Sequence, residues 1–277
     1  MKIIAVMNQK GGVGKTTVTV NLAAALALHK KRVLLIDADL QGNATTSLGL
    51  QPNTLGVVTC DLFTILTNQC SIKQAMLYRP ISSGGRKGVL DLIPATIALS
   101  GFDQLVRALP NKQLMLKQLL HDVRDYDYVF IDCPPSLGLL TINSLVAAHE
   151  VIIPVQPEFF GLQGLSQMLD TITLLQQTLN PKLMINGIVC TRYNRRKIHQ
   201  EVASCLYDRF GKTVFATKIY ENIALAEAPS HGKTIFEYEP QSVGAHDFDA
   251  LCREMLNREI VLGNMKHEQK NAHQKRV

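Results

Sequence analysis

A glycine-rich segment between an apolar run and a helix-like segment constrains this chain more than any other feature. Residues 10–17 read Lys-Gly-Gly-Val-Gly-Lys-Thr-Thr and come directly after the apolar run at residues 3–7. The segment at residues 16–28 that follows is helix-like. A strand, a glycine loop and a helix in this order are the context in which a phosphate-binding loop works. The sequence therefore predicts that this loop binds phosphate.

Each residue type in the loop has a part in holding phosphate. The glycines allow backbone N–H groups to turn inward around phosphate oxygens, and the helix N-terminus adds partial positive charge. Lys15 can reach the terminal phosphates, and the Thr16 hydroxyl can bind Mg²⁺. The first glycine position of the general pattern holds Gln9, and a second lysine follows it that one loop does not obviously need. We predict that the nucleotide contacts come from Lys10, Gly11, Gly12, Val13, Gly14, Lys15, Thr16 and Thr17.

Apolar runs rich in β-branched residues recur between helix-length segments and predict the fold class. Continuous apolar runs suit strands that are buried on both faces of a parallel sheet. Strands that alternate with helices predict an α/β fold with a doubly wound, mostly parallel sheet, whose ligands bind at the carboxyl ends of the strands. We predict strands at residues 3–7, 33–36, 89–93, 128–131, 151–153, 183–190 and 214–219. Helical spacing predicts two core stripes, Leu165, Met168, Leu169, Ile172 and Leu175 in one helix and Ile198, Val202, Leu206 and Phe210 in another.

Composition indicates one globular domain. Hydrophobic residues make up 46% of the 277 residues and charged residues 19%, which excludes a disordered chain. We predict a single domain over residues 1–263 and a flexible, polar, basic tail over residues 264–277. Residues 49–90 are poorly periodic, and residues 82–88 predict an exposed turn.

Three further observations favour a cytoplasmic location. No apolar stretch reaches the roughly 18 to 20 residues that cross a bilayer. The apolar run near the N-terminus leaves no room for a signal peptide. The six cysteines are scattered without a C-x-x-C pair, which indicates free thiols in a reducing compartment rather than a disulfide framework or a zinc site.

Acidic residues follow two of the predicted strands, where a phosphate site needs them. Asp37 and Asp39 follow the strand at residues 33–36, and Asp132 follows the strand at residues 128–131. An Asp that closes a buried strand beside a phosphate loop is the usual second anchor for Mg²⁺, so Thr16 and Asp132 form the predicted metal site. Asp37 and Asp39 share a side in extended chain. One could orient the attacking water while the other fixes the loop, and Asp39 is the better catalytic candidate.

These segments together resemble a known family. Residues 10–17, residues 34–43 (Leu-Leu-Ile-Asp-Ala-Asp-Leu-Gln-Gly-Asn) and residues 130–136 (Phe-Ile-Asp-Cys-Pro-Pro-Ser) resemble the deviant Walker A, A′ and B motifs of the ParA/MinD P-loop ATPases. Residues 227–232 (Glu-Ala-Pro-Ser-His-Gly) and 154–158 (Pro-Val-Gln-Pro-Glu) are similar to the ParA branch, the chromosome and plasmid partition ATPases. The similarity runs from Met1 to about residue 256, which is nearly the whole chain.

The resemblance implies a role for each site residue. Lys10 matches the signature lysine, which crosses an ATP-sandwiched dimer and touches the partner's nucleotide. Lys15 and Thr16 match the phosphate- and Mg²⁺-binding positions, Asp39 matches the residue that positions the hydrolytic water, and Asp132 matches the Walker B carboxylate. The resemblance therefore implies an ATPase with ATP and Mg²⁺ as cofactors and with Lys10, Lys15 and Asp39 as catalytic residues. Tyr220 and Asn222 match the adenine side of the pocket. The family's usual proline is replaced by Leu40, which loosens the switch loop.

The resemblance also implies partners. A ParA-type ATPase forms an ATP-dependent homodimer, binds nonspecific double-stranded DNA and is stimulated by a ParB-type centromere-binding protein. We therefore expect a nucleoid-associated protein that segregates a plasmid or a chromosome and binds no membrane. Because the chain begins at the ATPase strand, we expect it to lack the N-terminal operator-binding extension of larger plasmid partition proteins.

A basic cluster is the expected DNA contact. The net charge of +6 permits an anionic partner. The cluster consists of Arg192, Arg195, Arg196 and Lys197, although a solvated helix start would have the same composition. Residues 220–224 lack the arginines that the family leads us to expect and include Glu221 instead.

Other functions remain open on the residues alone. A MinD-type membrane switch needs a C-terminal amphipathic helix with bulky apolar residues, of which residues 265–270 offer almost none. An iron–sulfur carrier of related fold needs paired cysteines, whereas Cys133 is isolated. A metabolic ligase or kinase would need a substrate pocket that has no evident residues. A ParA-like ATPase that positions a protein cargo would share the same loop.

Overall fold

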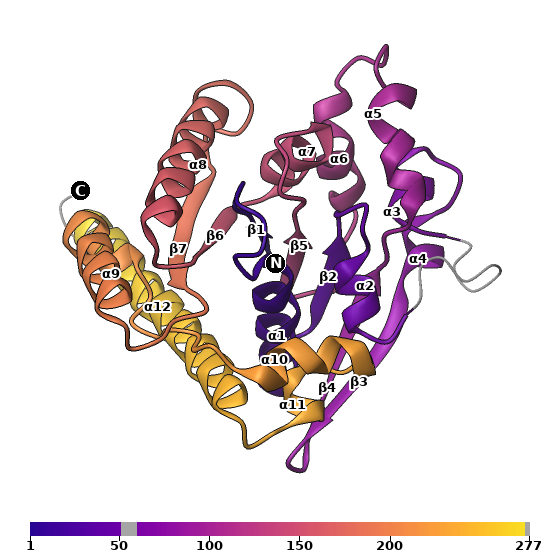
Figure 1. Cartoon of the computed structure of the whole chain (residues 1–277). Helices are drawn as coiled ribbons and strands as arrows, with labels where there is room; N and C mark the ends of the chain where they lie inside the picture. The colour runs from indigo at the N-terminus through magenta and orange to yellow at the C-terminus, as the bar shows by residue number, and fades with distance from the viewer. Residues whose placement is uncertain (51–59, 275–277) are drawn as a thin grey trace.

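A seven-stranded sheet forms the centre of the molecule, with helices on both sides (Figure 1). This computed structural model describes residues 1–50 and 60–274. The strand order is β3-β4-β2-β5-β1-β6-β7, in which β3 is antiparallel to β4 and the other neighbours are parallel. The strands are β1 (Lys2–Val6), β2 (Val33–Asp37), β3 (Leu77–Ser83), β4 (Arg86–Ile93), β5 (Tyr128–Asp132), β6 (Glu150–Val155) and β7 (Met184–Cys190). The predicted fold class is confirmed.

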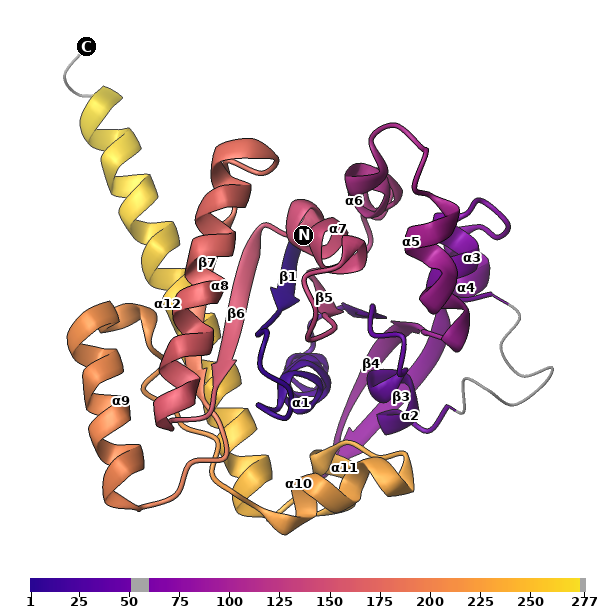
Figure 2. The same cartoon turned by 45° about the horizontal axis from the view of Figure 1, so that its top comes forward.

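Helices lie between most successive strands and after the last one, and they form the outer layers (Figure 2). The longest are α1 (Lys15–Leu28), α7 (Leu139–Ala147), α8 (Phe159–Thr178), α9 (Lys197–Phe210) and α12 (Val243–Gln274). The shorter ones are α2 (Asn43–Ser47), α3 (Leu62–Leu66), α4 (Ile72–Ala75), α5 (Phe102–Leu105), α6 (Met115–Leu120), α10 (Ile223–Glu227) and α11 (Ile235–Tyr238). The described residues also form the 3₁₀ turns η1 (Ile97–Gly101), η2 (Lys112–Leu114), η3 (Gly211–Thr213) and η4 (Ala228–His231).

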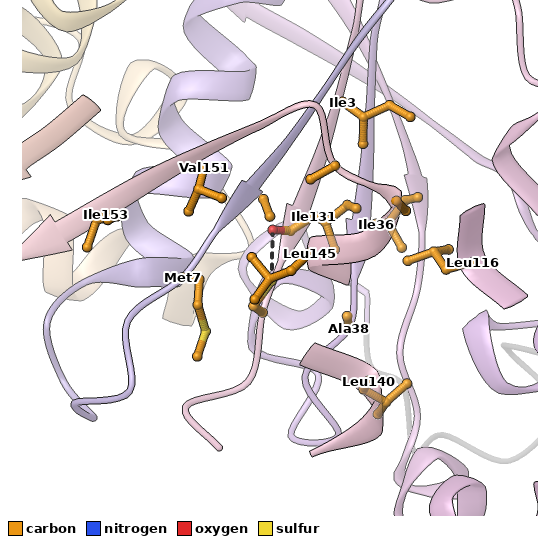
Figure 3. Packing of buried hydrophobic residues seen from close by; sticks show 14 of the residues in the cluster. Ile3, Met7, Ile36, Ala38, Leu116, Ile131, Leu140, Leu145, Val151 and Ile153 are labelled. Atoms are coloured by element: carbon orange, nitrogen blue, oxygen red, sulfur yellow. Dashed lines mark hydrogen bonds between the residues drawn. The ribbon is translucent and has the colours of Figure 1, made fainter. Parts of the chain in front are cut away.

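The two faces of the sheet carry two separate cores. Successive side chains of a strand point to opposite faces, so Ile3 belongs to one core and Ile4 to the other. The first core includes buried residues of α3 and of α5 to α9, and Figure 3 shows part of it, with Ile131 of β5 and Leu145 of α7 among the packed side chains. The second core includes buried residues of α1, α10, α11 and α12. Because both faces are covered, the strands need the continuous apolar runs seen in the sequence.

β3 and β4 form a hairpin. Most of it lies in the poorly periodic stretch at residues 49–90, and the sequence predicted only the strand at residues 89–93 in this region. The turn predicted at residues 82–88 is shorter in the structure, because Gly84 and Gly85 alone connect the two strands. Their φ angles of +53° and +77° lie in the left-handed region that glycine adopts without strain. Residues 51–59 of the same stretch lie outside the described residues.

The prediction of a strand at residues 214–219 is wrong. Val214 makes an isolated bridge with Ile188, and the Ile219 amide donates to the Cys190 carbonyl. Between these points the amides of Ala216 and Thr217 donate instead to the carboxylate of Glu254 on α12, each at 2.8 Å. A side chain thus takes the donors that a continuous ladder would need.

Two smaller predictions from the sequence also need correction. Cys60 and Cys70 form a disulfide, whereas Cys133, Cys190, Cys205 and Cys252 are free as predicted. The spacing of ten residues gave no sign of this pair, because only the folded chain brings the two Cα atoms to 6.0 Å. Ile198, placed in a core stripe from the sequence, is 46% exposed because it lies in the first turn of α9 at the surface.

The helix α12 continues through most of the predicted C-terminal tail. It ends at Gln274, so the boundary predicted between residues 263 and 264 falls inside the helix. Lysine, glutamine and glutamate recur beyond residue 264, and all three favour helix. Figure 2 shows the end of α12 reaching past the neighbouring helices. Within residues 1–50 and 60–274, no helix is long and apolar enough to cross a membrane.

Candidate active site

The predicted phosphate loop connects the carboxyl end of β1 to the first turn of α1. Gly12 and Gly14 have φ angles of +73° and +83°, a conformation that other residues rarely adopt. Gly14 occupies the N-cap position of α1 and provides no side-chain cap, and the first turn carries no acidic residue. The first amides of the helix are therefore left for an external acceptor, which is the arrangement that binds phosphate.

The loop is held in place by β6, the neighbour of β1, and by the residue that follows β7. The Thr191 hydroxyl, directly after β7, donates to the Val13 carbonyl at 2.7 Å. The side-chain amide of Asn8 donates to the Pro154 carbonyl of β6 at 2.7 Å, while its oxygen accepts from the Lys10 amide. Two neighbouring strands thus fix both ends of the loop before any ligand binds.

The two lysines of the loop have different surroundings. Lys15 is 8% exposed, and its ammonium donates to the Lys10 carbonyl at 3.3 Å. Burial lowers the pKa of Lys15, and the nearby Asp132 and Asp39 offset only part of that effect. The ammonium of Lys10 lies instead at the rim, 3.3 Å from the Glu158 carboxylate. Sequence reasoning assigned no role to Glu158, although it closes the segment at residues 154–158 that is similar to the ParA branch.

Asp132 closes β5 beside the start of α1. Its two carboxylate oxygens accept from Thr16 at 2.7 Å and from Thr19 at 2.9 Å. Burial, followed by repulsion from the adjacent Asp37, raises the pKa of Asp132 above its usual range, and the two hydroxyl bonds offset this only in part. A nearby cation would favour the ionised carboxylate. The structure therefore brings together the predicted metal pair, Thr16 and Asp132.

The donor set at Thr16 and Asp132 fits Mg²⁺ that is also held by phosphate. Both residues offer oxygen, the ligand atom that Mg²⁺ prefers. Among the residues that the structure describes, no group of three or more His, Cys, Asp or Glu side chains could hold a metal alone. Mg²⁺ is commonly bound through one or two protein groups together with substrate phosphates and water.

The structure separates the two acidic residues that follow β2. Asp37 lies opposite Asp132 in the sheet register, is fully buried, and accepts from the amide and the hydroxyl of Thr45 in α2. Burial raises the pKa of Asp37 despite these bonds. Asp39 stands beyond the strand, and its Oδ1 accepts from the Gln41 amide at 3.0 Å. Its Oδ2 has no hydrogen-bond partner within residues 1–50 and 60–274. The geometry thus gives Asp37 the loop-holding contacts and leaves an oxygen of Asp39 available.

The predicted adenine residues lie after the end of β7. The ring of Tyr220 meets that of Tyr193 edge-on with centroids 5.2 Å apart, and Tyr193 is two residues from Thr191, which contacts the loop. Asn222 is the N-cap residue of α10 and is half-buried. In the described part of the chain neither Tyr220 nor Asn222 hydrogen-bonds the phosphate loop.

The predicted DNA cluster is exposed and half of it is paired. Arg192 lies 3.6 Å from Glu221, the acidic departure noted in the sequence, and Lys197 lies 3.6 Å from Glu201. Exposed pairs of this kind contribute little to stability. Arg195 and Arg196 precede α9, and neither makes a side-chain ion pair within the described ranges. These two arginines are therefore the free charges of the cluster.

Comparison with known proteins identifies relatives that match most of the chain. A family model described as an AAA domain matches residues 1–185. The sporulation initiation inhibitor protein Soj of Bacillus subtilis is 45% identical over 260 residues, which cover 92% of this chain and 98% of that protein. The chromosome-partitioning ATPase Soj of Treponema pallidum is 44% identical, with 93% and 98% covered.

A solved structure shares the fold and the kind of ligand that the loop predicts. Cobyrinic acid a,c-diamide synthase from Mycobacterium smegmatis, with a bound ATP analogue and magnesium, superimposes with a TM-score of 0.78 at 34% sequence identity. The match covers 92% of this chain and 94% of that one.

Proposed function

The chain belongs to the ParA/Soj family of chromosome-partitioning ATPases, and from this membership we propose that it is an ATP-dependent DNA-partition ATPase. Its substrate is ATP, which it hydrolyses to ADP and phosphate, and Mg²⁺ is its metal cofactor. The relatives at 44% to 45% identity support partitioning over the amide synthesis for which the structural neighbour at 34% identity is named.

The loop and the buried lysine hold the nucleotide. The amides at the start of α1 and the Lys15 ammonium bind the β- and γ-phosphates, and Thr16 and Asp132 hold Mg²⁺, directly or through water. Bound there, Mg²⁺ supplies positive charge against the negative charge of the phosphates. Tyr220 and Asn222 line the adenine side.

Asp39 orients the water that attacks the γ-phosphate. Its carboxylate stands beyond the end of β2, on the same edge of the sheet as the phosphate loop. One oxygen is fixed by the Gln41 amide, which leaves the other to accept a proton of the water. Asp37 is unsuited to this step because both of its oxygens already accept hydrogen bonds from the backbone or from Thr45.

The observation that carries the proposal is the difference between Lys10 and Lys15. One buried lysine is sufficient for the nucleotide of its own subunit. Lys10 sits at the rim of the loop, where its side chain is 30% exposed and its ammonium is held by Glu158 alone among the described residues. In the active dimer Lys10 leaves Glu158 and contacts the nucleotide of a second copy, as an arginine finger does in other NTPases. ATP thereby joins two subunits face to face.

The dimer binds DNA without sequence preference and responds to a partner. The free arginines Arg195 and Arg196, together with Arg192 and Lys197, contact phosphates of nucleoid DNA. A ParB-type centromere-binding protein stimulates hydrolysis, which releases the DNA and moves a plasmid or a chromosome. The protein is accordingly cytoplasmic, nucleoid-associated and independent of membranes.

The test is nucleotide-dependent DNA binding. Purified protein is incubated with arbitrary duplex DNA in the presence of ATP, ADP or no nucleotide, and binding is measured by anisotropy at several salt concentrations. We expect binding with ATP that weakens steeply with salt, and weak binding otherwise. Hydrolysis of ATP without any DNA binding would support an ATPase that positions a protein cargo, and sedimentation with liposomes would support a membrane switch.

A further inference from the structure

A second cationic site lies at the edge of the sheet opposite the phosphate loop. A hollow of about 510 Å³ opens where β2, β4 and β5 begin, whereas the loop follows the end of β1. These strands are parallel, so the two sites are at opposite edges of the sheet. Its volume falls in the range of small-molecule sites. The catalytic scheme uses none of the residues that line it.

The hollow carries more positive than negative charge. Lys30, Lys31, Arg32 and Lys87 line it, against Asp91 and Asp125. Asp91 is already engaged, because it accepts from the Tyr126 hydroxyl at 2.6 Å. The Lys30 ammonium donates to the Lys87 carbonyl at 2.7 Å.

The other three cations of the hollow are uncommitted. The side chains of Lys31, Arg32 and Lys87 make no hydrogen bond or ion pair with any residue in ranges 1–50 and 60–274. Their charged hydrogen-bond donors are therefore available to a ligand.

The side chains of Lys31 and Arg32 are not needed to cap the C-terminal end of α1. Cations near a helix C-terminus can bond the last carbonyls. Here the backbone amides of His29, Lys30 and Lys31 donate to the carbonyls of Ala25, Ala27 and Leu26. Backbone amides thus hydrogen-bond these carbonyls at the end of α1. The charged groups of Lys31 and Arg32 are not used in capping the helix.

The walls of the hollow are fixed by backbone contacts. A Cβ atom at Gly88 would lie 2.3 Å from the Ala27 carbonyl oxygen, so only glycine lets α1 press directly on β4. Asp127 ties the starts of β2 and β5 together, because its carboxylate accepts from the Arg32 amide and its own amide donates to the Arg32 carbonyl, each at 2.8 Å. A site with fixed walls loses little entropy when a ligand binds.

We propose that this hollow binds a small phosphate ester that carries a flat ring, of which a nucleoside monophosphate is the simplest example. The ammonium groups of Lys31 and Lys87 and the guanidinium of Arg32 recognise the phosphate through charge-assisted hydrogen bonds. Val89, which is 38% exposed, and the half-buried ring of Tyr126 offer the apolar surface for the ring. The site is separate from the nucleotide that the phosphate loop holds.

The experiment fills the phosphate loop first and then titrates the second site. Full-length protein saturated with Mg·ADP is titrated with GMP and, separately, with guanosine in a calorimeter. GMP binds at least about tenfold more tightly than guanosine if phosphate is recognised. The variant Lys31→Glu/Arg32→Glu/Lys87→Glu loses at least about tenfold in GMP affinity. The milder Lys31→Gln/Lys87→Gln weakens GMP binding in the same direction.

A matched control removes the effect of overall charge. Lys73, Lys117 and Lys182 are exposed and do not line the hollow, so Lys73→Glu/Lys117→Glu/Lys182→Glu makes the same change of net charge and leaves GMP affinity within about twofold. The proposal is overturned if GMP does not bind, if both triple variants weaken it equally, or if the hollow variant affects only the binding of a duplex oligonucleotide. The last result would assign these cations to DNA instead.

Discussion

The ammonium of Lys10 and the carboxylate of Glu158 lie 3.3 Å apart within one chain, although 148 residues separate them. Gly164 of α8 lies beside this pair, because a Cβ atom there would be 3.7 Å from the Cβ of Lys10 and 3.5 Å from the side-chain oxygen of Asn8, both ordinary van der Waals distances. The lysine that we propose to act on a second subunit is thus held by its own subunit before ATP binds.

Replacing Lys10 separates dimer formation from nucleotide binding. Lys10→Ala should bind ATP with nearly parental affinity but fail to dimerise, because each nucleotide is then without its charge-assisted hydrogen bond from the other subunit. Light scattering with ATP measures the mass. Glu158→Gln should dimerise at least as well as the parent, with Glu201→Gln as the matched control. An Lys10→Ala variant that still forms the ATP-dependent dimer would refute the sandwich arrangement.

Replacing Lys15 should remove nucleotide binding itself. A hydrogen bond to a charged group contributes about 1.5 to 3 kcal/mol, so Lys15→Ala should weaken ATP affinity by about tenfold to a hundredfold or more. Equilibrium binding of a fluorescent ATP analogue checks this, and Lys10→Ala serves as the control for loss of one positive charge in the same loop. Unchanged affinity in Lys15→Ala would contradict the assignment of the loop.

Asp39 and Asp37 should respond differently to substitution. Asp39→Ala should retain ATP and hydrolyse it at least about a hundredfold more slowly, since it removes the group that orients the water. The trapped ATP-bound dimer should then accumulate. Asp37→Asn should lower the free energy of unfolding, because Asp37 accepts three hydrogen bonds in the core of the fold. Single-turnover hydrolysis and chemical denaturation measure the two effects, and parental hydrolysis by Asp39→Ala would exclude its proposed role.

The two unpaired arginines should dominate DNA binding. Arg195→Glu/Arg196→Glu should weaken the binding of arbitrary duplex DNA and reduce the salt slope by about 0.9 for each DNA phosphate that is no longer neutralised. ATP affinity should be unchanged. Arg192→Glu/Lys197→Glu makes the same charge change at residues that already face Glu221 and Glu201, and it should have the smaller effect. Equal losses of affinity in both double variants would argue for a purely long-range charge effect.

Acid should destabilise the fold through Glu254. Burial raises the pKa of this carboxylate, but hydrogen bonds from the Thr217 and Ala216 amides and from the Thr217 hydroxyl, together with Arg258, outweigh it and leave the pKa below 4.5. A lowered pKa in the folded state adds stability above the pKa of the unfolded state, and this is lost as pH falls through the folded value.

The free energy of unfolding should therefore fall as pH drops from about 5 to about 3, and it should fall less in Glu254→Gln. Urea denaturation at a series of pH values measures both curves. The exposed Glu201→Gln should follow the parent. If Glu254→Gln showed the same pH dependence as the parent, the carboxylate would have no part in acid stability.

Local sequence was sufficient for the parts of the site that are built by neighbouring residues. The order of apolar run, glycine loop and helix predicted β1, the loop and α1, because glycine geometry and hydrophobic periodicity act over a few residues. The positions of Asp37, Asp39 and Asp132 followed from the ends of predicted strands, which a parallel sheet brings to one edge. The confirmed fold rests on these short-range signals.

Tertiary structure decided the features that depend on residues far apart in the chain. The segment at residues 214–219 has the composition of a strand, yet Glu254 takes its amides. The ion pair of Lys10 with Glu158, the disulfide between Cys60 and Cys70 and the cationic hollow between α1 and β4 likewise arise from packing. The sequence already favoured Asp39 over Asp37 as the catalytic candidate, but the contacts of Asp37 with Thr45 of α2 appear only in the folded chain. Hydrophobic periodicity indicates which side of a helix or strand is buried. It does not indicate which residue from a distant part of the chain packs against that side.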